Sequence, residues 1–164
     1  MTEPAAAFDS AKFRQVLGHY PTGVTVVTAA TPDGVVGLAI GSFASVSLDP
    51  PLVAFFADKG SSSWPKIEAA GAFCVNVLAE DQEDVCRRFA SKVDDKFAGL
   101  GWTPAAGSGA PILAGVLAWI DCEIDAVLEA GDHWCVMGRA RELDVAREGG
   151  PLLFFRGGYG RFAV

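Results

Sequence analysis

Alternating hydrophobic and polar positions run through much of the chain and predict β-strands. In the clearest case, residues 118–128, Ile120, Cys122 and Ile124 share one face while charged residues share the other. Such a period of two is typical of a half-exposed strand. Almost wholly apolar runs predict strands buried on both faces. Further strands are expected at residues 24–28, 35–40, 52–57, 72–78, 133–141 and 152–155.

Helical spacing is confined to three short segments. Asp9 or Ser10 can cap a first helix that ends near Gly18. A second helix is expected at residues 65–70, with serines before it and a proline in its first turn. The third, residues 80–89, begins with acidic residues and ends with basic ones, which suits the helix dipole.

Strands therefore dominate, and no internal repeat is present. The order of elements predicts a mainly β fold with added helices, a closed or nearly closed antiparallel barrel carrying helices on its outside. Residues 1–164 are expected to form one domain, with a loose tail at residues 1–8. The segment 99–111, rich in Gly, Ala and Pro, is expected to be a surface loop. Its Gly99-x-Gly101 lacks the third glycine and the strand–helix setting of a dinucleotide fingerprint.

The stretch 37–51 combines strand-like alternation with small polar residues, and Asp49-Pro50-Pro51 ends it. Small side chains let a flat, large ligand approach the backbone and leave N–H groups and hydroxyls to bond it. The alternative is an inner strand whose serines bond neighbouring backbone. By itself the stretch favours this second interpretation slightly.

Charge and composition limit the classes of molecule that the protein is expected to bind. The formal net charge is −7 and no Lys/Arg cluster occurs, so neither nucleic acid nor an anionic membrane is expected to bind. A hydrophobic fraction of 51% with only 20% charged residues suggests apolar surface used for a subunit contact or a ligand cleft. With no secretory signal and no membrane-length apolar window, we expect a cytoplasmic protein.

The sequence contains few residues in patterns typical of metal binding or of nucleophilic catalysis. The four cysteines form no Cys-x-x-Cys pair and the two histidines sit in no ligand motif, so no metal site is expected. No serine lies in a Gly-x-Ser-x-Gly elbow. A barrel this poor in acids and bases indicates that a bound cofactor supplies the reactivity.

Sequence blocks spread over nearly the whole chain resemble the flavin reductase-like family, the small reductase components of two-component flavin-dependent monooxygenases. The resemblance implies a Greek-key-like, FMN-binding split β-barrel that forms a homodimer. It further implies hydride transfer from NADH or NADPH to FMN or FAD, and delivery of reduced flavin to a partner oxygenase. The blocks are residues 20–28, 37–51, 73–79, 89–97, 131–133 and 151–159.

The same resemblance assigns cofactor-binding residues. Residues 39–47 would line the isoalloxazine ring and the ribityl chain, with backbone N–H groups on the edge where charge collects on reduction. Lys59 and the serines after it suit a phosphate, with helix capping an equal alternative. For Asn76 a backbone partner, and for Lys92 plain solvation, stay open. The candidates are Ala39, Ile40, Gly41, Ser42, Ser45, Val46, Ser47, Asp58, Lys59, Ser61, Ser62, Asn76, Phe89, Ser91, Lys92, Lys96, Phe97 and Tyr159.

His133 is the candidate catalytic residue, because the histidine of Gly-Asp-His in the family lies on the nicotinamide side of the flavin. Its alternative is a turn histidine that bonds local backbone. Trp134 and Cys135 stand where the family has smaller β-branched residues, and 38–41 lacks the common Met-Thr run. Two other functions stay open. One is a flavin carrier or sensor without turnover, its nicotinamide face blocked by Trp134; the other is a different split-barrel oxidase or a haem pocket.

Overall fold

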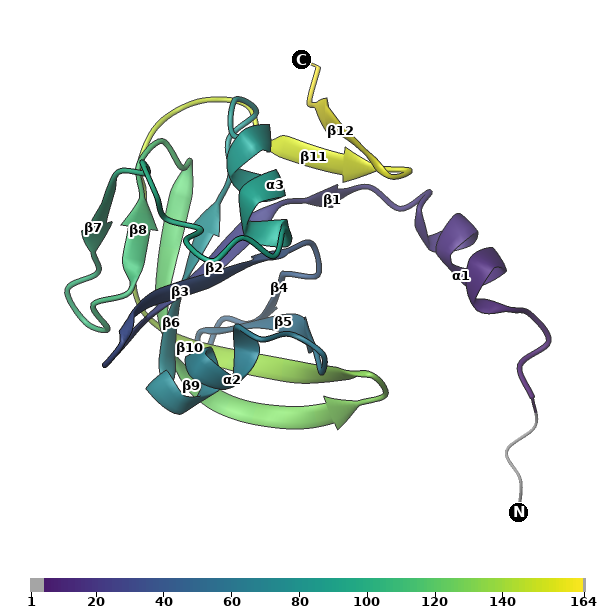
Figure 1. Ribbon diagram of the computed structural model, residues 1–164, viewed down its shortest axis with the longest axis horizontal. Coiled ribbons are helices and arrows are strands. Elements are labelled where there is room, and N and C mark those ends of the chain that lie inside the picture. Colours follow the sequence, from purple (N-terminus) through teal and green to yellow (C-terminus); the bar gives the residue numbers. More distant parts are fainter. Residues whose placement is uncertain (1–4, 164) are drawn as a thin grey trace.

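A computed structural model describes residues 5–163 of the protein (Figure 1). Its helices are α1 (Ser10–Leu17), α2 (Trp64–Ala70) and α3 (Glu83–Ala90). Its strands are β1 (Thr22–Gly23), β2 (Thr25–Thr31), β3 (Gly34–Ile40), β4 (Ala44–Ser47), β5 (Leu52–Asp58), β6 (Ala72–Val77), β7 (Trp102–Pro104), β8 (Pro111–Leu113), β9 (Ala118–Ala130), β10 (His133–Val145), β11 (Leu152–Phe155) and β12 (Gly158–Arg161). The predicted mainly β fold with added helices is confirmed.

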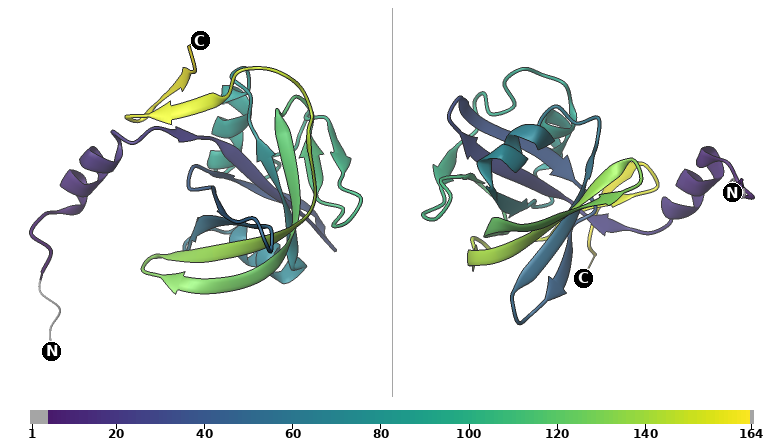
Figure 2. Two further views of the ribbon diagram at one scale, coloured as in Figure 1. Left: turned by 180° about the vertical axis from the view of Figure 1, so that it is seen from behind. Right: turned by 90° about the horizontal axis from the view of Figure 1, so that it is seen from below.

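Seven antiparallel strands form the main sheet in the order β3-β2-β6-β9-β10-β5-β4. The sheet curls until β3, at one edge, contacts β5 near the other (Figure 2). Ser42, between β3 and β4, completes the turn: its hydroxyl accepts a hydrogen bond from Phe56 N (2.9 Å) and lies 3.3 Å from Phe56 O. The predicted nearly closed antiparallel barrel follows from these contacts.

The stretch 37–51 is not one strand. β3 ends at Ile40, residues 41–43 cross the gap, and β4 begins on the opposite edge of the same sheet. The turn expected at Asp49-Pro50-Pro51 is present before β5. This stretch therefore supplies both edges of the barrel at the place where it is left open.

Two short hairpins were not predicted. Residues 99–111 were expected to be loop, but β7 and β8 pair there, with Trp102 opposite Leu113. Contacts from distant strands fix this hairpin: the Thr28 hydroxyl donates to Pro111 O at 2.6 Å, and Asn76 Oδ1 accepts from Leu113 N at 2.8 Å. The second hairpin joins β11 to β12, which with β1 form a separate sheet.

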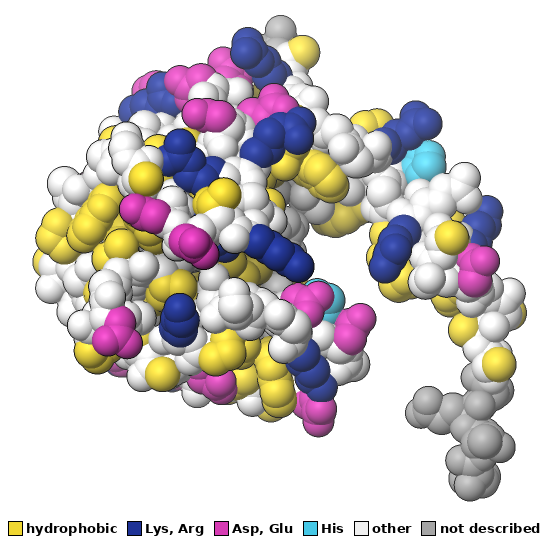
Figure 3. All heavy atoms as spheres, viewed as in Figure 1, with side chains coloured by type: hydrophobic (Ala, Val, Ile, Leu, Met, Phe, Trp, Pro, Cys, Tyr) yellow, Lys and Arg dark blue, Asp and Glu magenta, His cyan; other side chains and the backbone are white. Residues whose placement is uncertain are grey.

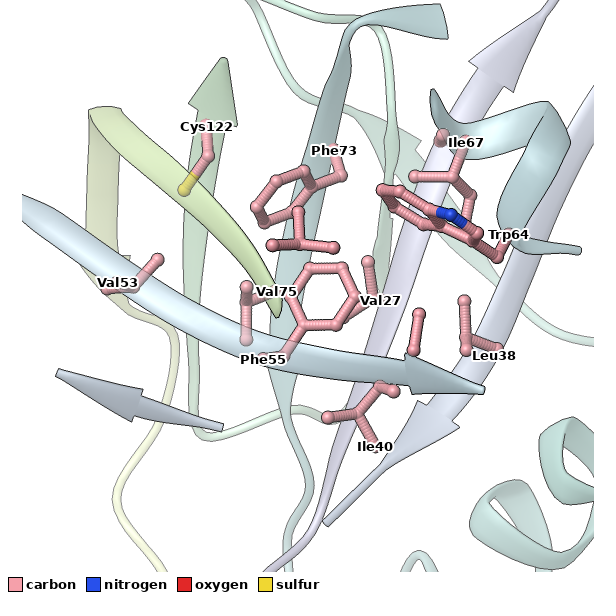
Figure 4. Packing of buried hydrophobic residues seen from close by; sticks show 13 residues of the cluster. Val27, Leu38, Ile40, Val53, Phe55, Trp64, Ile67, Phe73, Val75 and Cys122 are labelled. Carbon is pink, nitrogen blue, oxygen red and sulfur yellow. The ribbon is translucent and has the colours of Figure 1, made fainter. Parts of the chain in front are cut away.

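The main core lies between the sheet and α2 (Figure 4). Trp64 and Ile67 of α2 are buried, and Phe55 packs edge to face against Trp64 and Phe73 with ring centroids 6.0 and 5.1 Å apart. Each buried side chain of this size stabilises the fold by about 1.5–3 kcal/mol. A second cluster, centred on Phe89, lies beneath α3. The two helices are thus held on either side of β3.

One face of residues 118–128 was expected to be exposed to solvent, but in the structure only part of that face is exposed. Asp121 was placed on that face, yet its exposed fraction is 2%. The loop after β7 covers it, and Ser108 donates to its carboxylate through Oγ (2.5 Å) and the main-chain N–H (3.1 Å). Hydrogen bonds of this kind offset the cost of burying a charge.

Helix α1 stands away from the barrel, and hydrophobic side chains remain exposed along it (Figure 3). Its predicted cap is confirmed, because Asp9 Oδ1 accepts from Lys12 N at 2.8 Å. Its apolar residues Phe13, Val16 and Leu17 are more than half exposed. Of the predicted loose tail, residues 5–8 form neither helix nor strand, and residues 1–4 lie outside the described part.

No helix within residues 5–163 is long and apolar enough to cross a membrane. In the same part of the chain, no group of three His, Cys, Asp or Glu residues is arranged to hold a metal ion.

Candidate functional site

A cavity of about 1020 Å³ lies along β3, between α2 on one side and residues 89–97 on the other. We call it the β3 cavity. A volume near 1,000 Å³ is at the upper end for small-molecule sites. Its walls are formed by the β2–β3 turn and β3 (residues 31–39), residues 60–63, Lys66, Ala69, Ala70 and residues 89–97.

The floor of the β3 cavity is an unpaired strand edge. Val24 O accepts a hydrogen bond from Leu78 N (3.0 Å), which fixes the hydrogen-bonding pattern of the strand that follows. The even-numbered residues of β2 therefore direct their N–H and C=O groups toward β6, and the odd-numbered residues direct theirs toward β3. The residues opposite the even-numbered ones are Val35, Gly37 and Ala39, whose N–H and C=O groups therefore point away from β2. A row of main-chain donors and acceptors is available to a ligand lying along this edge.

Gly37 is required by the packing at the middle of the edge. A Cβ atom there would stand 2.8 Å from Cε1 of Phe89 and 3.2 Å from Val27 O. Phe89 in turn packs edge to face on Phe97, with ring centroids 5.0 Å apart. The missing side chain thus lets α3 and the segment after it approach β3 closely.

Lys96 closes this side of the cavity. Its Nζ donates to Phe89 O at 3.0 Å and lies 3.5 Å from Gly37 O. Partial burial lowers the pKa of the Lys96 ammonium, because the charged form loses water. Ser91 and Lys92 also line the cavity, and the Ser91 hydroxyl donates to Arg88 O at 2.6 Å. Two ammonium groups and a hydroxyl therefore lie on this side of the cavity, together with the carboxyl groups of Asp94 and Asp95.

The serines before α2 line the opposite wall. Ser61 Oγ accepts from Ser63 N and Trp64 N, both at 3.2 Å, and so secures the turn before α2. The N-cap residue of α2 is Ser63, which makes no capping hydrogen bond with its side chain. Ser62 lines the cavity and is exposed. The hydroxyl hydrogens of both serines remain available to a ligand.

Lys59 does not line the β3 cavity with these serines. Its ammonium forms an ion pair with Glu129 and lies 4.9 Å from the ring centroid of Trp134. The neighbouring Asp58 caps the turn, accepting from Gly60 N at 2.6 Å. Both residues therefore border the end of the β9–β10 hairpin, whose residues 129–133 we call the hairpin tip.

His133 lies at the hairpin tip, opposite Asp58 on β5. Its Nδ1 is 2.7 Å from Asp132 Oδ1, and this contact lowers the pKa of the Asp132 carboxyl. With the carboxylate accepting, Nδ1 carries the proton and Nε2 is left as an acceptor in the neutral ring. The side chain is 39% exposed, so its free edge reaches solvent.

The remaining residues of 39–47 occupy the open edges of the barrel. Ile40 is buried in the core, while Gly41, Ser45 and Val46 are exposed and Ser47 is half-buried. Next to them, the Thr22 hydroxyl is buried without a hydrogen-bond partner in the described residues, and a Cβ at Gly41 would lie 3.5 Å from it. Sequence reasoning missed Thr22, although it belongs to the Pro-Thr-Gly block that carried the resemblance.

Asn76 and Tyr159 lie away from the cavity. The Asn76 amide is fully buried and donates to Val26 O and Pro111 O, both at 3.2 Å, as the backbone alternative proposed. Tyr159 contacts Cys86, with Oη 3.4 Å from Sγ, and this hydrogen bond, together with burial, raises the pKa of Tyr159 to about 12. Both residues secure the cluster under α3 and the strands beside it.

The structure thus brings only part of the candidate set together. The β3 cavity is lined by Ala39, Ser61, Ser62, Phe89, Ser91, Lys92, Lys96 and Phe97. Asp58, Lys59 and His133 meet at the hairpin tip. Sequence reasoning missed Lys66, Ala69 and Ala70, because an exposed lysine and two alanines carry no signal until α2 is placed beside β3.

Comparison with known proteins identifies the family of the chain. Residues 17–163 match the family described as "Flavin reductase like domain". A flavin reductase of Pseudomonas putida is 59% identical and covers 100% of this chain and 99% of its own. The reductase subunit HsaB of a flavin-dependent monooxygenase from Rhodococcus jostii is 52% identical, over 94% of this chain and 79% of its own.

A solved structure gives the same result. The NADH:FAD oxidoreductase SgcE6 of Streptomyces globisporus, in complex with NAD and FAD fragments, superposes with a TM-score of 0.89 and 37% identity. The match covers 99% of this chain and 98% of that protein. The chain belongs to the flavin reductase-like family, and the resemblance, the fold class and the prediction of a flavin reductase enzyme are confirmed.

Proposed function

We propose that this protein transfers hydride from NADH or NADPH to FMN or FAD and supplies the reduced flavin to a separate oxygenase. The observation that carries the proposal is the β3 cavity: an unpaired strand edge flanked by hydroxyls and by ammonium groups that belong to no ion pair in the described residues. These groups fit a flavin, whose tail combines hydroxyls with a phosphate and whose ring presents hydrogen-bonding edges.

In this proposal the flavin ring lies at the Ala39 end, near the gap between β3 and β4. The Thr22 hydroxyl at that gap has no hydrogen-bond partner among residues 5–163 and gives the ring a donor. Lys92 and Lys96 attract the phosphate, and the serines before α2 bond it from the other wall. Bound flavin supplies the two-electron acceptor.

His133 serves the nicotinamide cofactor. Asp132 holds the imidazole by its Nδ1, which leaves the opposite ring nitrogen to orient a carboxamide or a diphosphate. Hydride transfer needs the two rings in near contact more than it needs an acid or base. His133 is therefore proposed to position the donor and to move no proton.

A homodimer belongs to the same proposal, supported by the apolar residues of α1. A helix that exposes Phe13, Val16 and Leu17 leaves apolar surface in water unless another molecule covers it. We expect a second copy to do so. Light scattering should give a dimer for the wild type, and Val16→Asp should shift the mass toward the monomer; a monomeric wild type would contradict the dimer without touching the flavin site.

The oxygenase and the compartment complete the proposal. The name of the HsaB relative makes it one subunit of a monooxygenase, which supports a separate oxygenase as the acceptor of reduced flavin here. A cytoplasmic location is supported by the four free cysteines, since thiols stay reduced in that compartment.

The test is a steady-state assay that crosses NADH and NADPH with FMN, FAD and riboflavin. We expect oxidation of at least one nicotinamide to depend on added flavin. A protein that binds flavin but leaves both nicotinamides unoxidised would be a carrier, and the proposal would be wrong.

A further inference from the structure

The β3 cavity is longer than the tail of FMN. It extends from Ala39 to the β2–β3 turn, and the strand between Ala39 and Gly34 spans about 17 Å at the usual rise per residue. The ribityl phosphate of a flavin has seven bonds of about 1.5 Å, which reach roughly 9 Å when extended. With the ring at Ala39, its phosphate comes level with Gly37 and Lys96.

The cavity beyond that point has its own chemistry. We call it the far half, lined by Val35, Lys66, Ala69 and Ala70 together with the β2–β3 turn. α2 lies along this part of β3: in Figure 4, Leu38 is near Trp64 and Ile67, whereas Ile40 is farther from the helix. The alanines leave a shallow apolar wall opposite residues 91–95.

Polar groups in the far half sit on its rim. Lys66 is exposed and belongs to no ion pair among residues 5–163. Asp33 in the turn offers a carboxylate to sugar hydroxyls or an exocyclic amine. Between them, the main chain of Val35 faces the cavity with one donor and one acceptor. The facing wall adds Lys92, Asp94 and Asp95. The cation Lys66, the acceptor Asp33 and the apolar wall between them match an adenosine joined through a second phosphate.

We propose that the far half binds the adenosine monophosphate portion of FAD, so that this protein binds FAD more tightly than FMN. The inference rests on the proposed function, because it takes the flavin ring to lie at Ala39. Lys66 contacts the second phosphate, the adenine ring lies against Ala69 and Ala70, and the edge of Val35 bonds the base.

Calorimetric titration of the purified dimer or monomer with FAD, FMN and riboflavin tests this directly. We expect FAD to bind roughly tenfold more tightly than FMN. The difference corresponds to one additional charge-assisted contact, between Lys66 and the second phosphate, together with the contacts of the adenine base. Equal affinities, or tighter binding of FMN, would overturn the inference while leaving the proposed function intact. Failure to bind any of the three flavins would contradict the proposed function itself.

Two variants and a matched control locate the effect. Ala69→Trp fills the far half from an exposed helix position and should weaken FAD binding about tenfold while FMN stays within about twofold. Glu68→Trp, the next residue of α2 and outside the cavity lining, is the matched control and should leave both affinities unchanged. Lys66→Gln should lower FAD affinity selectively. Equal losses of FAD and FMN in Ala69→Trp would place the adenosine elsewhere.

Discussion

The β3 cavity and the hairpin tip present charge in opposite ways. In the cavity, Lys92 and Lys96 form no ion pair in the described residues, and Lys96 is held only by carbonyl oxygens. At the hairpin tip, Lys59 is paired with Glu129 and His133 with Asp132. A cation without a carboxylate can bind a phosphate without first breaking a pair. Although Asp33, Asp94 and Asp95 also line the cavity, this difference is the reason why the proposed function assigns the phosphate to the cavity and the orientation of the nicotinamide to the tip.

Gly37→Val should have the largest effect, because it removes the close approach on which the cavity depends. The new side chain would meet Phe89 within 2.8 Å and push α3 and residues 91–97 from β3. We expect flavin affinity to fall roughly 100-fold and the free energy of unfolding to drop by about 1–3 kcal/mol. Gly160→Ala, with nothing within 4 Å of its Cβ, is the control. Unchanged flavin affinity in Gly37→Val would separate the cavity from the flavin site.

Exchanging lysines for methionine compares the two regions directly. Lys96→Met should weaken flavin binding about tenfold, because a phosphate contact and the anchor to Phe89 O are both lost. Lys59→Met should change it less than about threefold, since its ammonium is already engaged by Glu129. Flavin titrations of both variants check the order. A larger loss for Lys59→Met would reverse the assignment of the two regions.

His133→Ala should act on the nicotinamide alone. We expect the KM for the nicotinamide cofactor to rise by about tenfold while the flavin Kd stays within about twofold. Asp132→Asn keeps the size of the side chain but weakens its hydrogen bond with His133 Nδ1. It should therefore raise the KM for the nicotinamide cofactor by a smaller factor. Equal losses in nicotinamide and flavin binding would refute this role for His133.

Tyr159 lies in neither region and should give the smallest effect. Tyr159→Phe removes the contact with Cys86, which we expect to lower the free energy of unfolding by about 1 kcal/mol and to leave flavin affinity unchanged. Because its pKa is raised to about 12, the hydroxyl stabilises the fold below pH 10, and this contribution is lost as the pH rises toward 12. Denaturant unfolding below pH 10 should give a constant difference between the two proteins. A fall in flavin affinity in Tyr159→Phe would contradict this prediction and would indicate that Tyr159 contacts the flavin.

The strands with strong local patterns were predictable, because burial and alternation act within a few residues. The β2–β3 hairpin, β5, β6 and β9 follow such patterns. The β7–β8 hairpin was missed since Thr28 and Asn76, far away in sequence, hold it in place. Asp121 was misplaced for the same reason: only the folded loop brings Ser108 to its carboxylate.

The lining of the β3 cavity was predictable where a residue type is tied to a motif, and less so where only the position of a residue in the fold matters. Lys96 and Phe89 were found through the resemblance and line the cavity. Lys59 has the right charge, but the register of β5 with β10 turns it toward Glu129. Ala69 and Ala70 have no functional group that could mark them in the sequence. Only the placement of α2 beside β3 shows that they line the cavity.

Hydrogen exchange measured with flavin alone, and then with flavin and NAD⁺, tests the division of labour between the two regions most directly. We predict that flavin alone slows exchange in residues 34–39 and 89–97, and that adding NAD⁺ extends the protection to residues 129–134. Flavin that protected the hairpin tip while leaving 34–39 and 89–97 unchanged would contradict the account.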